Sequence, residues 1–153
     1  MKANRIYVAA AAVAIASVAM VGCKKKEAEA PVAPVAVAPT ASVTAVDFGT
    51  AAGSDSKIST AATSFKATDT VIASVATTTS DAMATVPSTV GAKVSFNGSE
   101  VPGTAQNSQV NLSGSNNTAF KWTAPAKGWP VGTYNVDVSL NGAVVQSKTF
   151  EVK

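Results

Sequence analysis

Histidine is absent from the 153 residues, and cysteine occurs only once. Zinc and copper sites are built largely from imidazole and thiolate ligands, so the sequence predicts no such metal site and no cofactor. A Ser-His-Asp or Cys-His catalytic arrangement is excluded for the same reason. A single cysteine also excludes an intrachain disulfide. These absences remove the most familiar kinds of catalytic and metal centres.

Charged residues are also scarce, at 14% of the chain. The formal net charge is +3, but the excess lies near the N-terminus, at Lys2, Arg5 and the run Lys24-Lys25-Lys26. From Asp47 onward, seven acids are balanced by seven lysines, at positions 57, 66, 93, 121, 127, 148 and 153. A protein that binds nucleic acid shows a basic patch or stripe. We therefore expect no nucleic-acid partner.

The N-terminal residues have the layout of a secretory signal. Lys2 and Arg5 precede an uncharged apolar run over residues 6–21, and small residues follow, as at a signal cleavage site. A membrane-spanning helix needs about 20 apolar residues, and this run is shorter than that. We predict that residues 1–22 form a signal helix that is cleaved.

The sequence Met20-Val21-Gly22-Cys23 resembles the lipobox of bacterial lipoproteins, with Met20 where that family favours leucine. The resemblance implies that Cys23 becomes the mature N-terminus and carries a diacylglycerol thioether and an acylated amine, such as a palmitate. Several acyl chains anchor a protein far more firmly than one. Lys24 differs from the aspartate that retains such lipoproteins in the inner membrane, so the outer membrane is favoured. The alternative is a free Cys23 at the end of an ordinary signal or an uncleaved anchor.

Residues 23–46 are predicted to form a linker. Its residues 27–42 contain three prolines among alanine and valine and show no periodic apolar face. Proline removes backbone donors and favours polyproline II, so we expect a disordered or extended segment. Fully extended, it would reach on the order of 50 Å. It is interpreted either as a spacer that gives reach or as a tolerated linker of no particular length.

Residues 47–153 are predicted to form an all-β domain. The clearest strand covers residues 132–140, where Tyr134, Val136, Val138 and Leu140 share one face. Asn141-Gly142 follows, the favoured pair for a two-residue type I′ hairpin. The return strand is predicted over residues 143–152, and its core residues are Phe150 and Val152.

Further strands follow from alternation and turn residues. They are predicted at residues 90–96, closed by Asn97-Gly98, at 70–77, from 117 through Phe120 and Trp122, and at an edge strand over 100–110. A pair at residues 45–49 and 57–60 opens the domain. About seven strands over about 107 residues fit an antiparallel immunoglobulin-like β-sandwich with a single core.

The last third of the chain resembles immunoglobulin-like modules at the ends of bacterial envelope proteins. The resemblance is carried by Phe120-Lys121-Trp122, by Gly-Trp-Pro-Val-Gly-Thr-Tyr at 128–134, by Asn141-Gly142 and by Phe150-Glu151-Val152. In such modules a Gly-x-Tyr opens the penultimate strand, and its tyrosine hydroxyl forms a corner, which implies this role for Tyr134. The fold serves many functions, so the resemblance implies no activity.

Few residues are candidates for a site. Trp122 and Trp129 are interpreted either as a ligand platform for a sugar or peptide, or as core and cap residues, and the core interpretation is favoured because Trp122 is in phase with Phe120. A catalytic pair could be sought among the acids, but they lie in different predicted segments and are interpreted as surface residues; they are Asp69, Asp81, Glu100 and Asp137. The segment 53–57 contains too few acids for a calcium loop.

The sequence therefore predicts a lipid-anchored, non-enzymatic protein of the cell envelope. Its membrane partner is lipid through Cys23, and its immunoglobulin-like domain would bind another envelope protein or polymer, or act structurally. The alternative is a module that binds carbohydrate or peptidoglycan through exposed aromatic residues.

Overall fold

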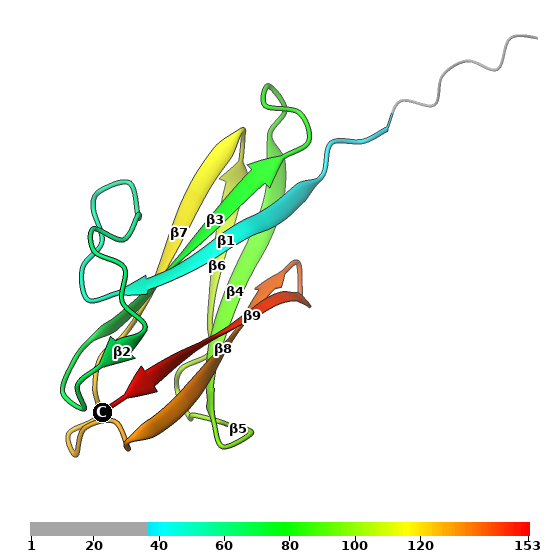
Figure 1. The fold of residues 1–153 in the computed structure, drawn as a ribbon. Helices are drawn as coiled ribbons and strands as arrows, with labels where there is room; N and C mark the ends of the chain where they lie inside the picture. Colours follow the sequence, from blue (N-terminus) through cyan, green and yellow to red (C-terminus); the bar gives the residue numbers. More distant parts are fainter. Residues whose placement is uncertain (1–36) are drawn as a thin grey trace, which may run out of the picture. The chain divides into compact units, whose positions relative to one another are not determined.

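The computed structural model describes residues 37–153 as two β-sheets, with no helix among these residues (Figure 1). The predicted signal helix, the residues Met20 to Cys23 and most of the linker lie outside the described residues. No helix in the described part of the chain has the length and apolarity needed to cross a membrane.

The described residues form nine strands in two sheets. One sheet has the order β1-β3-β7, and the other has the order β2-β9-β8-β4-β5, with β6 also paired to β4. All pairs are antiparallel except β2 with β9. The strands are β1 (Ala41–Gly49), β2 (Ser64–Phe65), β3 (Val71–Thr79), β4 (Val86–Phe96), β5 (Ser99–Glu100), β6 (Gln106–Leu112), β7 (Ser115–Trp122), β8 (Gly132–Leu140) and β9 (Ala143–Val152).

The order of the strands is that of an immunoglobulin-like sandwich. Apart from the two-residue strand β2, which pairs with β9, the chain stays in the first sheet through β3 and enters the second at β4. It then returns to pair β7 with β3, and ends in the hairpin β8–β9 beside β4. This matches the arrangement in which strands A, B and E face strands G, F and C. The all-β class and the two-sheet sandwich are confirmed. The predicted count of about seven strands is not, because nine are present and two of them, β2 and β5, contain only two residues.

The C-terminal hairpin has the predicted form. The strands β8 and β9 have the predicted bounds. Asn141 and Gly142 have φ values of 52° and 86°, as a type I′ turn requires. Phe150 and Val152 are each 1% exposed. Local sequence therefore determines this hairpin.

Several boundaries differ from the prediction. The strand β4 begins at Val86 rather than at residue 90, β7 begins at Ser115 rather than at 117, and β3 covers Val71–Thr79 rather than 70–77.

Three further differences have a clear structural cause. The strand β1 begins at Ala41, inside the segment assigned to the linker, because β3 continues to Thr79 and supplies pairing partners up to Ala41. Residues 57–60 form no strand; a turn closed by Gly53 N–H donating to Lys57 O at 2.9 Å leaves only the isolated bridge Ala52–Ile58. The strand β6 begins at Gln106, because Pro102 and Gly103 (φ 78°) interrupt the extended chain before it.

An aromatic cluster joins the two sheets in the core. The Phe150 ring of β9 stacks on Tyr134 of β8, with centroids 5.1 Å apart. The rings of Phe48 and Phe65 meet Phe150 edge-on, at 5.5 and 5.4 Å. Edge-on and offset contacts of this kind are favourable beyond the area they bury. Since Phe48 belongs to β1, the cluster ties the first sheet to the second.

The tyrosine corner is present. The Tyr134 hydroxyl donates to the carbonyl oxygen of Pro130 at 2.8 Å, and the residue is 1% exposed. Burial raises the pKa of Tyr134, because ionisation would place a charge away from water. The corner fixes the turn that leads from β7 into β8.

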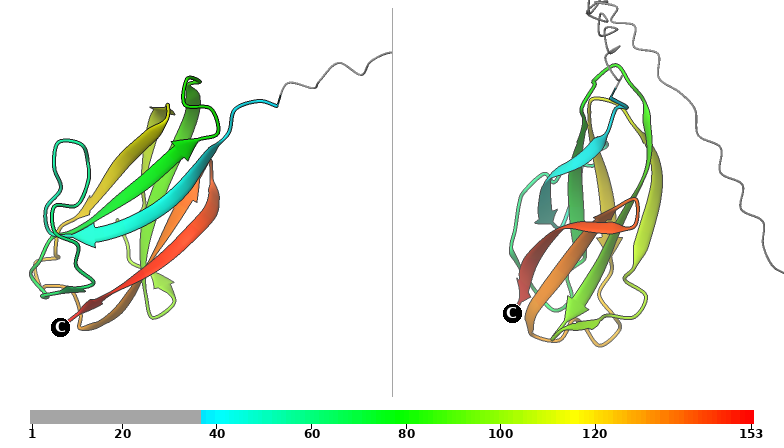
Figure 2. Two further views of the ribbon diagram at one scale, coloured as in Figure 1. Left: turned by 45° about the horizontal axis from the view of Figure 1, so that its top comes forward. Right: turned by 90° about the vertical axis from the view of Figure 1, so that its right-hand side faces the viewer.

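The two ends of the sandwich carry different segments (Figures 1 and 2). The chain enters β1 beside the β3–β4 turn, where Ser80 N–H donates to Thr40 O at 2.9 Å. The C-terminus lies at the opposite end, near the segment that joins β7 to β8. The point where the chain enters β1 and the C-terminus therefore lie at opposite ends of the sandwich, about the length of the strands apart.

Candidate functional site

Both tryptophans are buried. Trp122 is 3% exposed, and its indole N–H donates to Thr104 O at 2.7 Å; Trp129 is 4% exposed, and its indole N–H donates to Asp69 O at 3.0 Å. A platform for stacking a sugar needs an open ring face. Neither indole presents one, and both pack in the core cluster.

The four candidate acids are not brought together as a catalytic group. Asp69 accepts from Lys66 N–H at 2.8 Å, and Asp81 accepts from Met83 N–H at 2.9 Å, so both carboxylates close turns. Glu100 is exposed on β5. Residues 37–153 contain no group of three or more His, Cys, Asp or Glu side chains placed to hold a metal ion.

Asp137 lies in a small polar network on the outer face of β8. Its Oδ1 accepts from Asn135 Nδ2 at 2.7 Å and from Ser147 Oγ at 2.6 Å, and its other oxygen is 3.9 Å from Lys93 Nζ. Asp137 is therefore held by two hydrogen bonds and one long ion pair, all within its own sheet. This arrangement orders the sheet surface and provides no second acid for proton transfer.

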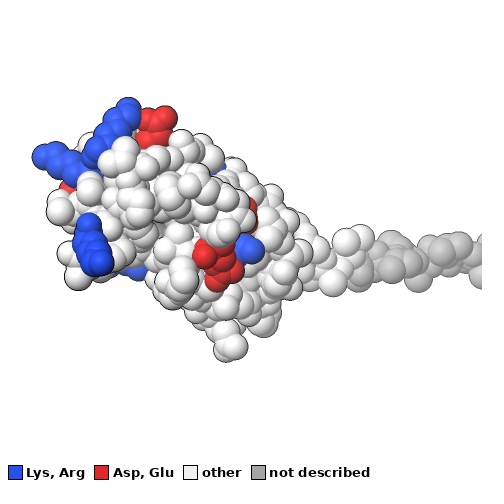
Figure 3. Space-filling view, turned by 90° about the horizontal axis from the view of Figure 1, so that it is seen from below, with Lys and Arg blue, Asp and Glu red and all other residues white. Residues whose placement is uncertain are grey.

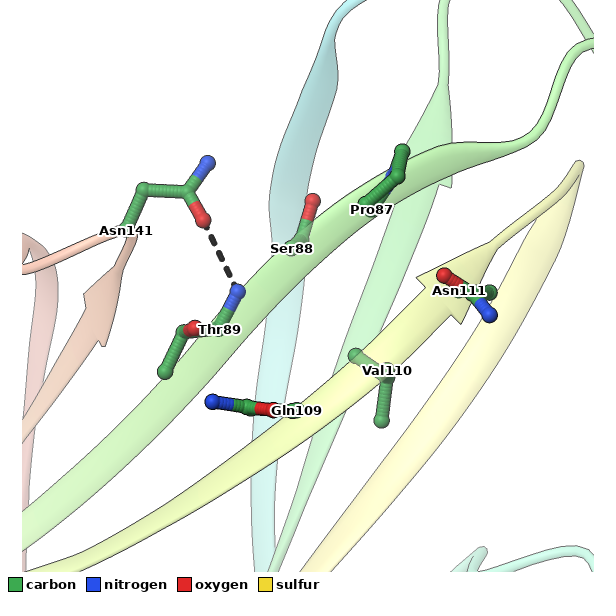
Figure 4. A pocket seen from close by; sticks show the side chains of 7 residues that line it. All are labelled: Pro87, Ser88, Thr89, Gln109, Val110, Asn111 and Asn141. Atoms are coloured by element: carbon green, nitrogen blue, oxygen red, sulfur yellow. Dashed lines mark hydrogen bonds between the residues drawn. The ribbon is translucent and has the colours of Figure 1, made fainter.

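A groove with a volume of about 420 Å³ lies beside the start of β4. We call it the amide groove (Figure 4). Its lining residues come from β4, β6 and the β8–β9 turn, and are Pro87, Ser88, Thr89, Gln109, Val110, Asn111 and Asn141.

The amide groove exists because β4 is longer than its neighbour β8. The last pair between them is Val90 with Leu140, and β4 extends beyond it to Val86. Asn141 closes the end of the ladder: its Oδ1 accepts from Thr89 N–H at 2.8 Å, and its own N–H donates to Thr89 O at 2.8 Å. On the other side of β4, Gln109 and Asn111 extend from β6 (Figure 4).

The chemistry of the amide groove is neutral and polar. Three carboxamides and two hydroxyls line it, together with the apolar groups of Pro87 and Val110, and none of the seven lining residues is ionisable. Carboxamides both donate and accept hydrogen bonds. The sequence analysis missed this site, because it assigned Asn141 only to a turn and did not single out Gln109 or Asn111.

A second recess, of about 240 Å³, lies farther along β4 and is also lined by Lys93, Asp137 and Asn107. It adjoins Gly91, where an added Cβ would meet the Ser139 hydroxyl and the Asn107 amide. A third recess, of about 240 Å³, is mostly apolar and lies beside the tyrosine corner, lined by Phe96, Val101, Pro102, Trp129 and Pro130, among others.

Charged side chains are spread thinly over the domain. Seen from below, they form small separate groups with uncharged surface between them (Figure 3). The ion pairs are mostly on the surface, as in Lys57–Asp55 and Lys153–Glu151. No charged side chain lines the amide groove.

No protein-family model and no curated protein matches the sequence. Among solved structures, the chain is similar to the CARDB domain of the PF1109 protein from Pyrococcus furiosus, which was solved in complex with di-metal ions. The two are 15% identical with a TM-score of 0.42, and the match covers 75% of this chain and 92% of that chain. The assignment of the fold here rests on the order of the strands.

Proposed function

We propose that this protein is a lipid-anchored, non-catalytic binding module of the bacterial cell envelope. In this proposal Cys23 carries the lipid, residues 24–40 act as a spacer, and the sandwich binds another envelope protein or polymer. The Met20-Val21-Gly22-Cys23 sequence supports the anchor, and Lys24 favours the outer membrane.

The observation that favours binding over catalysis is the lining of the amide groove. General acid–base catalysis needs a titratable group within hydrogen-bond reach of the reacting atoms. The groove offers amides, hydroxyls and apolar surface, and no titratable side chain. Such a surface suits recognition of an uncharged partner through hydrogen bonds.

The anchor is tested with the full chain expressed in a diderm bacterium beside Cys23→Ala. We expect the intact mass of the wild type to show loss of residues 1–22 and a gain of lipid, and we expect the protein to fractionate with the outer membrane. The variant should keep a lipid-free mass and leave that fraction. An unmodified thiol on the wild type, with the same distribution for both proteins, would refute the anchor.

The binding role is tested separately. The detergent-solubilised full chain is used to capture components from an envelope extract, beside a variant with both Gln109→Ala and Asn111→Ala. We expect at least one component of the extract to bind the wild-type protein saturably, and we expect the variant to capture much less of it. Recovery of the same components by both proteins would contradict a binding role for this face.

A further inference from the structure

We propose that the amide groove binds an uncharged glycan strand. The inference rests on the proposed binding function and names the class of ligand for the same site. It follows from the groups that the groove leaves available, from the shape of its lining, and from the blocked backbone of β4.

The available hydrogen-bonding groups suit hydroxyls. Asn141 uses its Oδ1 to accept from Thr89 N–H, which fixes the carboxamide and leaves its NH₂ group to donate. Among the hydrogen bonds within residues 37–153, none involves the side chain of Gln109 or Asn111. A carboxamide pairs well with a hydroxyl, because both donate and accept. A charged ligand would find no counter-charge in this lining.

The lining also has apolar surface for the C–H faces of sugar rings. Pro87 supplies it, since Pro87 is exposed and pairs with Asn111 on the same face of the sheet. Val110 also lines the groove, but it alternates with Gln109 and Asn111 and packs against the core. The volume of about 420 Å³ lies in the range of small-molecule sites. Fixed groups reduce the ordering cost of binding, and Asn141 is already held in place.

The polar lining continues beyond one sugar. Asn107, Gln109 and Asn111 occupy alternate positions on β6, so they lie on one face of the strand. Gln109 and Asn111 line the amide groove, while Asn107 lines the neighbouring recess. A row of amides across two recesses fits a chain of sugars better than a single sugar.

An extended peptide is disfavoured at this site. Adding a strand requires free backbone N–H and C=O groups along β4. Pro87 has no N–H, and the N–H and C=O of Thr89 are both bonded to Asn141. The beginning of β4 is thus closed to a partner strand, which leaves side-chain recognition as the mode of binding.

The test uses the ¹⁵N-labelled full chain in detergent, titrated with chitotetraose and with maltotetraose as uncharged probes. The side-chain NH₂ signals of Gln109, Asn111 and Asn141 report directly on the groove. We expect saturable shifts of these signals with at least one probe. A short uncharged valine–threonine peptide is titrated in parallel.

Two variants and a control test the assignment. The double variant Gln109→Ala with Asn111→Ala should weaken binding at least tenfold. Asn141→Gly removes one amide but tolerates the positive φ of the turn, and should weaken binding severalfold. Gln146→Ala removes an amide of β9 outside the groove and should bind as the wild type does.

The inference is overturned if neither oligosaccharide shifts the groove signals, if only the peptide does, or if the double variant binds as well as Gln146→Ala. Each of these outcomes refutes only the assignment of a glycan. The proposed function still stands if Cys23 is lipidated and the extract yields a component whose capture depends on the groove. Failure of the extract experiment as well would refute both.

Discussion

The two sheets differ in what covers their outer faces. In the first sheet, β3 is buried on both sides: Val71, Ala73 and Val75 face the core, and Ile72 and Ser74 on the opposite side are only 8% and 5% exposed. In the second sheet, most outward residues of β4 and β8 are half-buried, and those of β6 are exposed. In the first sheet only the central strand is covered, because the strands on either side of it expose Asp47 on β1 and Ala119 and Lys121 on β7.

The segment after β1 covers part of the outer face of the first sheet, at the end of β1. An added Cβ at Gly49 would meet the Ile58 side chain and the Thr60 carbonyl, so this segment lies directly on the strand. Gly49 is the register partner of Ile72, so Ile58 covers the region where Ile72 is buried. The comparison teaches that the central strand of the first sheet is closed to a ligand, whereas β4 of the second sheet is accessible at the amide groove.

The two sheets share one core, and Phe150→Ala tests this. Among the substitutions, it should cause the largest loss of stability. The Phe150 ring contacts Phe48, Phe65 and Tyr134. Its loss leaves a cavity between the sheets and should lower the free energy of unfolding by about 3–5 kcal/mol. Urea unfolding at neutral pH measures this. The control Val144→Ala, at a residue 56% exposed, should cost far less, and equal losses would contradict a shared core.

A pair of glycines tests the outer faces of the two sheets directly. Gly49→Ala would place a methyl group against the backbone carbonyl of Thr60 as well as Ile58, and should cost about 1–3 kcal/mol. Gly91→Ala, on the outer face of the second sheet, would meet the ends of the Ser139 and Asn107 side chains closely, and the backbone oxygen of Gln106 only at an ordinary contact distance of 3.5 Å. The two side chains can turn away, so the cost should be smaller. Urea unfolding of both variants gives the difference, and a costlier Gly91→Ala would reverse the comparison.

The features that were predictable from the sequence are local. The hairpin of β8 and β9 follows from strict alternation and from Asn141-Gly142. The corner at Tyr134 was implied by the resemblance of Gly132-Thr133-Tyr134 to immunoglobulin-like modules, and the hydrogen bond to Pro130 O is present. The burial of both Trp122 and Trp129 agrees with the favoured interpretation of these residues.

The features that were missed depend on distant parts of the chain. The burial of Ile72 depends on a segment that folds back from β1, and alternation within β3 gives no sign of it. The amide groove depends on β4 being longer than β8 at one end, and on β6 lying beside it. Such differences in strand length appear only when the strands are paired, so no local motif marks Gln109 or Asn111.

The tyrosine corner allows a test that separates hydrogen bonding from packing. Tyr134→Phe keeps the stacked ring but removes the bond to Pro130 O, and should cost about 0.5–1.5 kcal/mol at neutral pH. The raised pKa of Tyr134 means that the folded protein keeps a proton that the unfolded chain releases above its ordinary value of 10.0. The wild type should therefore lose stability as the pH rises above about 10, and its advantage over Tyr134→Phe should shrink. Urea unfolding from pH 8 to 11 measures both. A constant difference over that range would refute the assignment.

The smallest expected effect comes from the ion pair Lys148–Asp47, which among residues 37–153 links the two sheets where β1 and β9 meet. Lys148 donates to Val46 O, lies 3.3 Å from Asp47 Oδ1, and is placed over the Phe48 ring with its Nζ 5.8 Å from the centroid. Both partners of the ion pair are well exposed, so Lys148→Met should cost no more than about 1 kcal/mol.

The matched control is Lys93→Met, whose ion pair joins strands of a single sheet. Urea unfolding at low and high salt compares them. We expect the Lys148 variant to cost more, because it also removes a donor to β1 and a contact with Phe48, and we expect its cost to fall as salt screens the pair. Equal costs at both salt concentrations would show that packing of Phe48 and Phe150 alone holds the two sheets together at this side.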